Sequence, residues 1–187
     1  MNTHFPSRTL YRHNSQLSQP ILDEMLRLCK SLPYHASLTE GNDKPVDKRA
    51  SQQCWLRYDS WIGGILHNIL ISANNAYFHY DLNHFDSEIQ VTKYEPGQFY
   101  EWHVDQLKAD NLMKRKLSIS LVLNNDFTGG DLQLLETDSL YNETATTVQL
   151  SAGDAAVFPS WVVHRVTPVT SGTRYSLVAW MNGPQFK

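Results

Sequence analysis

A histidine and an aspartate stand two positions apart in the stretch YEPGQFYEWHVDQ, as His103 and Asp105. Side chains two positions apart in a β-strand point to the same face, so this imidazole and this carboxylate would lie side by side. Both groups are common metal ligands. The best candidate for a third ligand is His164, which follows a strand-like run in FPSWVVHRVTP about sixty residues downstream. These three residues form a candidate metal site.

Two histidines and one carboxylate leave the other coordination positions of a metal ion open. Ferrous iron in oxygenases suits this arrangement, because substrate and O2 can bind at the open positions. Zinc accepts the same ligands with water as a fourth. A His-x-Asp pair is also often a plain structural pair, so these residues alone leave the question open. The remaining histidines have no comparable spacing, and we interpret them as structural or exposed: His4, His13, His35, His67, His79 and His84.

An arginine begins the strand-like run RYSLVAW, ten positions after His164. Alternation places Arg174, Ser176 and Val178 on one face of that strand. An arginine binds a carboxylate through two parallel hydrogen bonds, so Arg174 with a hydroxyl beside it would suit the far end of a dicarboxylate co-substrate. The alternative is an ordinary arginine in a salt bridge.

Strand patterns occupy the chain from about residue 88. The runs EIQVTKY and KLSISLVLN alternate, and turn signals such as Pro96-Gly97, Gly129-Gly130 and Ser171-Gly172 separate the runs. About eight short strands in under a hundred residues predict a mainly β protein with a double-sheet jelly roll. An immunoglobulin-like sandwich is the alternative, but it has no place for the long helix expected over 60–76.

The front of the chain has helical periodicity instead. A first helix is expected in QPILDEMLRLCKSL, with Ile21, Met25, Leu28 and Leu32 on one face, and a second over 60–76, capped by Asp59 or Ser60. We therefore predict one domain, residues 1–187. Its front part, residues 1–87, is a helical support that packs on one sheet of the core, residues 88–184.

The composition limits the kinds of binding partner that we expect. The 187 residues carry 16 Lys and Arg against 19 Asp and Glu, without a basic run, so we expect no nucleic-acid partner. The longest apolar stretch is interrupted by polar residues, which predicts no membrane span. Cys29 and Cys54 are interpreted as buried free thiols in a cytoplasmic protein, although they could pair. The oligomeric state is not predicted.

The motifs together resemble the Fe(II)- and 2-oxoglutarate-dependent dioxygenases, and are most similar to the prolyl-4-hydroxylase-like branch with its bacterial and phage members. The similarity rests on His103-x-Asp105, His164 and Arg174-x-Ser176, within KYEPGQFYEWHVD, TGGDLQLL and LSAGDAAVFPSWVVHRVTPVTSGTRYSLVAW. It covers roughly residues 88–184. The implied fold is a double-stranded β-helix, the cupin-like jelly roll, with Fe(II) held by the two histidines and the aspartate.

The resemblance also implies a site for 2-oxoglutarate. Its C5 carboxylate would bind Arg174 with help from Ser176, and Tyr94 matches a tyrosine that lines the co-substrate pocket. Family members often have a further tyrosine on the strand before the LN turn, but SISLVLN has none. The second donor to the carboxylate is therefore open, with Ser118 or Ser120 as substitutes.

The implied activity is hydroxylation of an unactivated C–H bond, with O2 as co-substrate, release of succinate and CO2, and ascorbate as a candidate reductant. Asp105 favours hydroxylation over halogenation, because halogenating members have a small residue there. A prolyl residue of a peptide or protein is the expected substrate; the alternative is a free amino acid or other small molecule. The polar segment 37–54 is a candidate lid or substrate cleft, to which Arg49 adds a charge. The alternatives are a non-catalytic metal-binding module and a zinc hydrolase, but neither explains the presence of Arg174.

Overall fold

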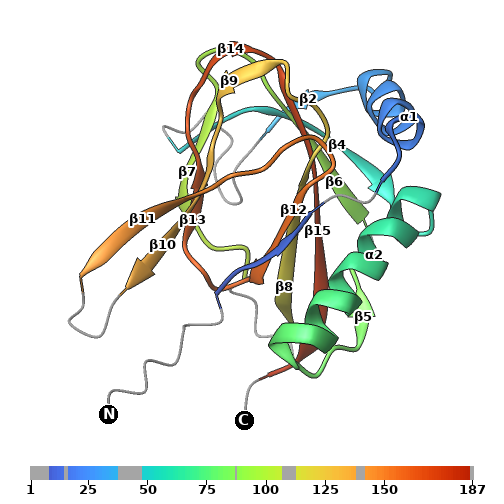
Figure 1. Cartoon of the computed structure of the whole chain (residues 1–187), viewed down its shortest axis with the longest axis vertical. Helices are drawn as coiled ribbons and strands as arrows, with labels where there is room; N and C mark the ends of the chain where they lie inside the picture. Colours follow the sequence, from blue (N-terminus) through green and yellow to red (C-terminus); the bar gives the residue numbers. More distant parts are fainter. Residues whose placement is uncertain are drawn as a thin grey trace.

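The computed structural model describes residues 9–14, 17–37, 48–86, 88–106, 113–137 and 142–185. Two antiparallel sheets face each other, and the helices lie outside the larger sheet (Figure 1). This arrangement confirms the predicted jelly roll with flanking helices. From residue 88 onward ten strands are described, where the sequence predicted about eight, because the three-residue strands β9 and β13 carry too little pattern to be recognised.

The larger sheet has the order β1-β12-β8-β15-β6-β4-β2, and β5 pairs with β15 outside this path. Its strands are β1 Tyr11–His13, β12 Ala155–Pro159, β8 Met113–Val122, β15 Arg174–Pro184, β6 Glu88–Tyr94, β4 Gln52–Arg57, β2 His35–Ala36 and β5 His84–Phe85. The smaller sheet has the order β11-β10-β13-β7-β3. Its strands are β11 Glu143–Val148, β10 Leu132–Thr137, β13 His164–Val166, β7 Phe99–His103 and β3 Arg49–Ala50. A third pair joins β14 Val169–Gly172 to β9 Phe127–Gly129.

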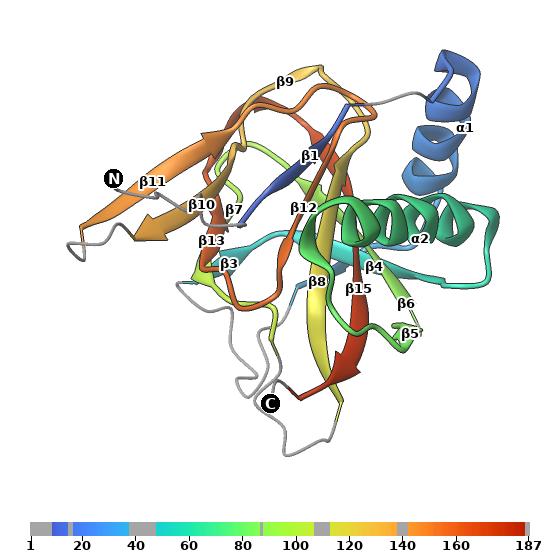
Figure 2. The ribbon, with the colours of Figure 1, turned by 60° about the horizontal axis from the view of Figure 1, so that its bottom comes forward.

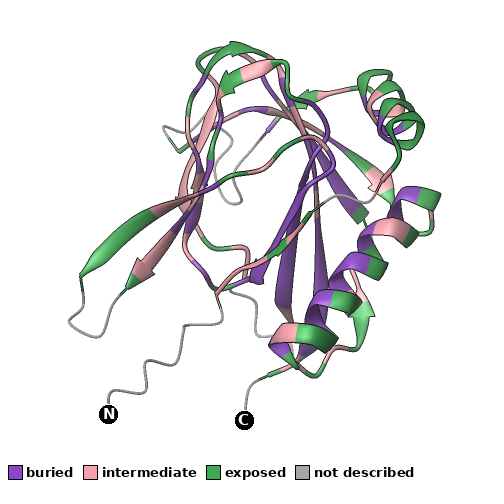
Figure 3. Ribbon diagram, in the orientation of Figure 1, coloured by how far each residue is buried: buried purple, intermediate pink, exposed green. Residues whose placement is uncertain are grey.

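The two faces of the larger sheet differ because its strands alternate. On β6, Ile89 and Val91 are fully buried on the helix side, whereas Gln90 faces the other way. On β15, Leu177 belongs to the same apolar cluster, while its neighbour Ser176 faces the space between the sheets. Figure 3 shows this sheet as the most buried part of the fold. The main apolar core therefore lies between the larger sheet and the helices, and the opposite face is free to carry polar groups.

Helix α2, Trp61–Ala73, supplies much of that core through side chains that include Ile62, Leu66 and Leu70. Its N-cap is Ser60, whose hydroxyl accepts a hydrogen bond from the amide of Gly63 at 3.3 Å. A short π-helix, η1 Asn74–Phe78, continues it. Within the described ranges, no helix has the length and apolar character needed to cross a membrane.

Helix α1, Gln19–Lys30, begins near Pro20 as predicted, but its buried face differs from the predicted one. Leu22, Met25 and Cys29 are buried, whereas Ile21 is 38% exposed. The sequence placed Ile21 with Leu28 and Leu32 because the apolar residues of this segment fit two overlapping faces. The contact with the larger sheet selects the face that carries Cys29. Both cysteines are free and buried, as predicted.

The front of the chain, residues 1–87, is more than a helical support, because it also supplies five short strands. The chain runs from β3, which pairs with β7 of the smaller sheet, directly into β4, which pairs with β6 of the larger sheet. The boundary expected at residue 88 therefore falls between β5 and β6, both of which pair with β15 in the larger sheet. That residues 1–187 form one domain stays a prediction.

Candidate active site

A cavity of about 540 Å³ lies between the two sheets. The larger sheet contributes polar side chains from its inner face, and the smaller sheet contributes two histidines and a tyrosine. Residues from the larger sheet are Gln53, Trp55, Gln90, Tyr94, Arg115, Ser120, Phe158, Arg174, Ser176, Val178 and Trp180. Residues from the smaller sheet include Arg49, Tyr100, His103 and His164.

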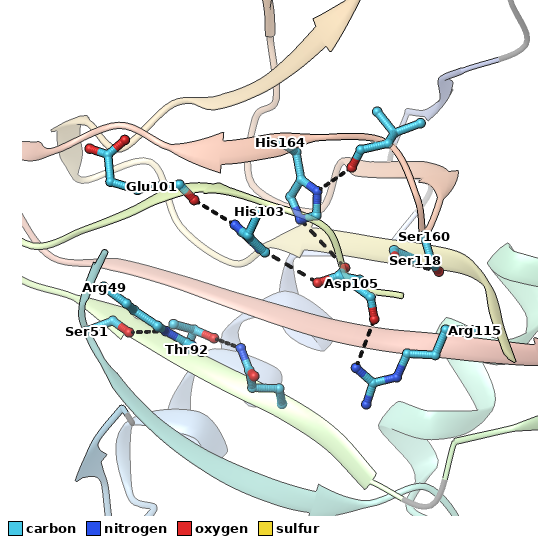
Figure 4. A network of polar contacts seen from close by, with 12 residues as sticks. Arg49, Ser51, Thr92, Glu101, His103, Asp105, Arg115, Ser118, Ser160 and His164 are labelled. Carbon is cyan, nitrogen blue, oxygen red and sulfur yellow. Dashed lines mark hydrogen bonds and ion pairs between the residues drawn. The ribbon is translucent and has the colours of Figure 1, made fainter. Parts of the chain in front are cut away.

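The three predicted ligands meet at this cavity (Figure 4). His103 ends β7 and His164 begins β13, and the two residues are directly opposite in the register of this strand pair. Asp105 follows β7, where its backbone amide donates to the carbonyl of Ser160 at 2.9 Å. One candidate ligand atom from each side chain lies within 4.8 Å of the others. The carboxylate oxygens of Asp105 lie 3.7 Å from His103 Nε2 and 3.6 Å from His164 Nε2.

Hydrogen bonds fix the orientation of both imidazoles. His103 Nδ1 is 2.7 Å from the carbonyl oxygen of Glu101, and His164 Nδ1 is 2.9 Å from that of Val162. A carbonyl accepts only from a protonated Nδ1, so each Nε2 carries the lone pair and faces Asp105. The ring of Tyr100 stacks on His103 with the ring centroids 3.5 Å apart. Both rings are therefore held in the orientation that a metal ligand needs.

The charge states also suit metal binding. Burial, followed by the proximity of His164, lowers the pKa of His103 from 6.5 to about 4, so this imidazole is neutral at pH 7. Burial acts to raise the pKa of Asp105, but His164 and His103 outweigh it and lower the pKa from 3.8. Asp105 Oδ2 is buried without a hydrogen-bond partner among the described residues. An ionised, unpartnered oxygen beside two lone pairs fits a divalent metal ion.

Arg174 is only 2% exposed, at the start of β15. Its Nη1 donates to Ser176 Oγ at 2.8 Å, and its guanidinium carbon lies 5.7 Å from the ring centroid of Tyr94. Burial lowers the pKa of Arg174, although Tyr94 and Asp131 oppose this. Of the ion pairs that the described residues form, none includes Arg174. The arginine is therefore available to an anion in the cavity, which argues against an ordinary salt bridge.

Gly130 makes room for this arginine. It has a φ of +64°, and a Cβ at this position would lie 2.9 Å from Val169 Cγ2 and 3.0 Å from Arg174 Cδ. The Gly129-Gly130 turn predicted from the sequence thus leaves space for the Arg174 side chain, because a larger residue at position 130 would clash with it.

The two candidate substitutes for the missing tyrosine differ in position. Ser120 lines the cavity on β8. Ser118 is fully buried, and its hydroxyl lies 3.0 Å from that of Ser160. Ser120 is the better placed of the two. Trp102 lies outside the cavity, where Arg165 stacks on its ring at 4.5 Å, whereas Trp180 lines it.

Residues from the front of the chain complete the cavity, and the sequence indicated only one of them. Arg49, predicted as a charge in the 37–54 segment, is 8% exposed and lines the cavity with Gln53 and Trp55. Positions 49, 51, 53 and 55 alternate with the period of a strand, which was the available signal. The part of the predicted 37–54 lid that comprises residues 38–47 lies outside the described residues.

The jelly roll and its His-Asp-His site together define a protein of the class that binds a catalytic metal through three residues on one side. The sequence comparison gives the family: residues 89–182 match the model of the 2OG-Fe(II) oxygenase superfamily, and the chain belongs to this superfamily. Membership implies Fe(II), 2-oxoglutarate and O2 as the metal and co-substrates, which agrees with the predicted cofactors.

Curated relatives are similar to part of this chain. A PKHD-type hydroxylase from Psychrobacter sp. (strain PRwf-1) is 43% identical over 95 residues, which are 47% of this chain and 35% of the relative. A second, from Synechococcus sp. (strain JA-2-3B'a(2-13)), is 36% identical over 98 residues, which are 50% and 42% of the two chains. The matched part thus spans less than half of these curated relatives.

Two solved structures share the fold over nearly the whole chain. A Pseudomonas putida prolyl-4-hydroxylase has a TM-score of 0.74 at 22% identity, over 96% of this chain and 95% of that one. A Trichoplax adhaerens prolyl hydroxylase in complex with a peptide fragment of the hypoxia inducible factor oxygen degradation domain has a TM-score of 0.73 at 18% identity. That match covers 94% of this chain and 84% of the other. At these identities the likeness establishes the fold alone.

Proposed function

We propose that this protein is a 2-oxoglutarate-dependent dioxygenase that hydroxylates an unactivated C–H bond, with a prolyl residue in a peptide or protein as its substrate. The observation that carries the proposal is the convergence of His103, Asp105 and His164 at a cavity that also contains Arg174, a buried arginine outside every described ion pair. The names of the relatives support the substrate class, since they are PKHD-type and prolyl hydroxylases.

In this proposal, His103, Asp105 and His164 hold Fe(II). Bound iron would supply the activation of O2 that attack on a C–H bond requires, with 2-oxoglutarate converted to succinate and CO2. The chain's own part is to present two imidazoles and one carboxylate in a fixed orientation. The carbonyls of Glu101 and Val162 serve this role, because each holds one imidazole with Nε2 toward Asp105.

Arg174 and Ser176 bind the far carboxylate of 2-oxoglutarate in this proposal, and Tyr94 lines the same pocket. Arg174 already directs one guanidinium nitrogen to Ser176 Oγ, so both groups donate from one side. A carboxylate held there gains charge-assisted hydrogen bonds in a site shielded from water, where such bonds are strongest. Ser120 is the proposed second hydroxyl donor.

A free amino acid or another small molecule is the second candidate substrate, because the cavity volume of about 540 Å³ accepts either kind of ligand. A non-catalytic module with a structural metal is less well supported, since such sites normally have a fourth protein ligand and the described residues place only three together. A cytoplasmic location is also part of the proposal, supported by the buried free thiols of Cys29 and Cys54.

The test is anaerobic reconstitution of the protein with Fe(II) and 2-oxoglutarate. We expect a weak visible charge-transfer band, and succinate release once air is admitted. Asp105→Ala should lose iron retention and the band while remaining folded. A panel of prolyl peptides and amino acids would then be screened for stimulated succinate release and a mass increase of one oxygen. A folded protein that gives neither the band nor succinate would refute the proposal.

A further inference from the structure

Three residues from the front of the chain, Arg49, Gln53 and Trp55, form part of the cavity lining. We call these three residues the β3–β4 wall. Arg49 pairs in register with Tyr100 of the smaller sheet, whereas Gln53 and Trp55 lie on the strand beside β6 of the larger sheet. Figure 2 shows β3 and β4 as one continuous path from one sheet to the other. All three side chains of the wall line the cavity.

Arg49 is a buried cation with unused hydrogen-bonding capacity. Its Nε donates to Ser51 Oγ at 2.9 Å, Ser51 in turn donates to Ser37 Oγ at 2.7 Å, and the guanidinium lies over the ring of Tyr100 at 4.4 Å. These contacts hold the head group in place. Among the described residues, its Nη2 is nevertheless buried without a hydrogen-bond partner, and none of their ion pairs includes Arg49. In Figure 4 His103 lies between His164 and Arg49.

The neighbouring residue of the wall offers the opposite polarity. Gln53 Oε1 is buried and has no hydrogen-bond partner among the described residues, so an acceptor stands on the same wall as the spare donor of Arg49. Trp55 is 42% exposed at the edge of the cavity, with its ring 6.4 Å from that of Trp180. Buried polar atoms without partners are rare in folded proteins, and two on one wall indicate a ligand that supplies both partners.

The charges of the cavity indicate the sign of that ligand. Arg115 already has a partner, since it pairs with Asp86 at 2.9 Å. Under the proposed function, the two charges of Fe(II) and the single charge of Arg174 would be balanced by Asp105 and the dianionic co-substrate. No acidic group in the described part of the chain pairs with Arg49, so its charge would remain unbalanced there. A buried cation without an anion is costly, so the third component of the complex should carry a negative charge.

We propose that the β3–β4 wall is the subsite for the hydroxylated substrate and that Arg49 binds a carboxylate of that substrate. Gln53 accepts a hydrogen bond from a substrate N–H, and Trp55 packs against the apolar part. This inference rests on the proposed function and narrows its substrate to a carboxylate-bearing amino acid or peptide. The carboxylate has two possible sources, the α-carboxylate of a free amino acid or an acidic side chain beside a prolyl residue.

The test compares matched ligand pairs on protein loaded anaerobically with Fe(II) and 2-oxoglutarate. L-Proline against L-prolinamide tests the α-carboxylate, and acetyl-Ala-Pro-Asp-amide against acetyl-Ala-Pro-Asn-amide tests the side chain. Binding is measured by calorimetry, and turnover by succinate release. We expect the carboxylate member of one pair to bind about 10- to 100-fold more tightly than its neutral partner, the scale of a charge-assisted hydrogen bond in a buried site. The pair that shows this preference identifies the source of the carboxylate.

Two variants assign the effect. Arg49→Gln should abolish the preference while the 2-oxoglutarate titration of the absorption band changes less than about threefold, because the co-substrate binds elsewhere. Arg49→Lys keeps the charge without the planar head group and should retain part of the preference. Arg57→Gln is the matched control, because Arg57 is an exposed arginine at the end of β4 that pairs with Asp59 outside the cavity, and this variant should behave as wild type.

The outcomes separate this inference from the function on which it rests. Equal binding within both pairs, or no binding of any of the four probes, overturns the inference. An Arg49→Gln variant that weakens 2-oxoglutarate as strongly as Arg174→Gln also overturns it, since Arg49 would then belong to the co-substrate site. If wild-type protein shows neither the charge-transfer band nor succinate release, the proposed function is refuted instead. In that case the carboxylate preference is measured on metal-free protein. Its loss in Arg49→Gln would support the inference, and its retention in that variant would overturn it.

Discussion

Acidification should destabilise the metal-free protein through His103. Its pKa in the folded state is lowered from 6.5 to about 4, because the ring is buried and close to His164. The unfolded chain therefore binds a proton between these two pH values that the folded protein excludes. The contribution of His103 to stability is present above pH 6.5 and is lost as the pH falls toward 4.

The size of this effect follows from the two pKa values. The full shift is equivalent to about 3 kcal/mol, of which about 2 kcal/mol is lost by pH 5. The pKa of Asp105 is lowered from 3.8, so its own titration falls below this window. The free energy of unfolding, measured with urea in the presence of a chelator, should therefore fall between pH 8 and pH 5 in wild type. The His103→Gln variant should lack this part of the decrease.

An exposed histidine provides the control. His35→Gln removes a histidine from the short strand β2, and this variant should keep the pH dependence of wild type. If wild type and His103→Gln lose the same free energy between pH 8 and pH 5, the imidazole is not excluded from protonation by burial. The inference that His103 is held as a neutral imidazole, as a metal ligand must be, would then be wrong.

Three further predictions follow from the geometry. Arg174→Gln should raise the 2-oxoglutarate concentration for half-saturation by about 10-fold or more, the loss of a charge-assisted bond, and an unchanged titration would remove Arg174 from the site. Gly130→Ala should lower the melting temperature and weaken 2-oxoglutarate binding, because the new Cβ meets Arg174 Cδ at a positive φ; a wild-type-like titration would contradict this. Leu66→Ala should cost about 2–5 kcal/mol in urea unfolding without altering the iron site, since Leu66 is fully buried in the core between helix and sheet.

The positions of the three candidate ligands could be predicted because local rules place them. His103 and Asp105 are two positions apart at the end of a strand, and the strand-like run before His164 marked a second strand. The same alternation put Arg174 and Ser176 on one face. The pairing of β7 with β13, which sets His103 directly opposite His164, could not be predicted from the sequence. Strand pairing depends on contacts between residues that are distant in the chain.

The front of the chain was harder to predict because its strands are short. β2 and β3 have two residues each, too few for a period to be seen. Their strand conformation comes from pairing with longer strands, and this is a tertiary effect that overrides local propensity. The contact of Arg49 with the smaller sheet was not predicted for the same reason. Its charge was noted, but its place in the cavity depends on the crossing from β3 to β4.

The larger sheet explains how the protein remains stable although polar side chains line the space between its two sheets. Its helix-facing side carries the apolar core, so stability does not depend on filling the space between the sheets with apolar side chains. That space instead holds Asp105, Arg49 and Arg174, three ionisable groups whose burial without full partners is unfavourable. Each of them lies on or beside a strand that is fixed by pairing with its neighbours. The cost of their burial is therefore best explained by ligands that restore the missing partners: a metal ion for the carboxylate and anions for the two arginines.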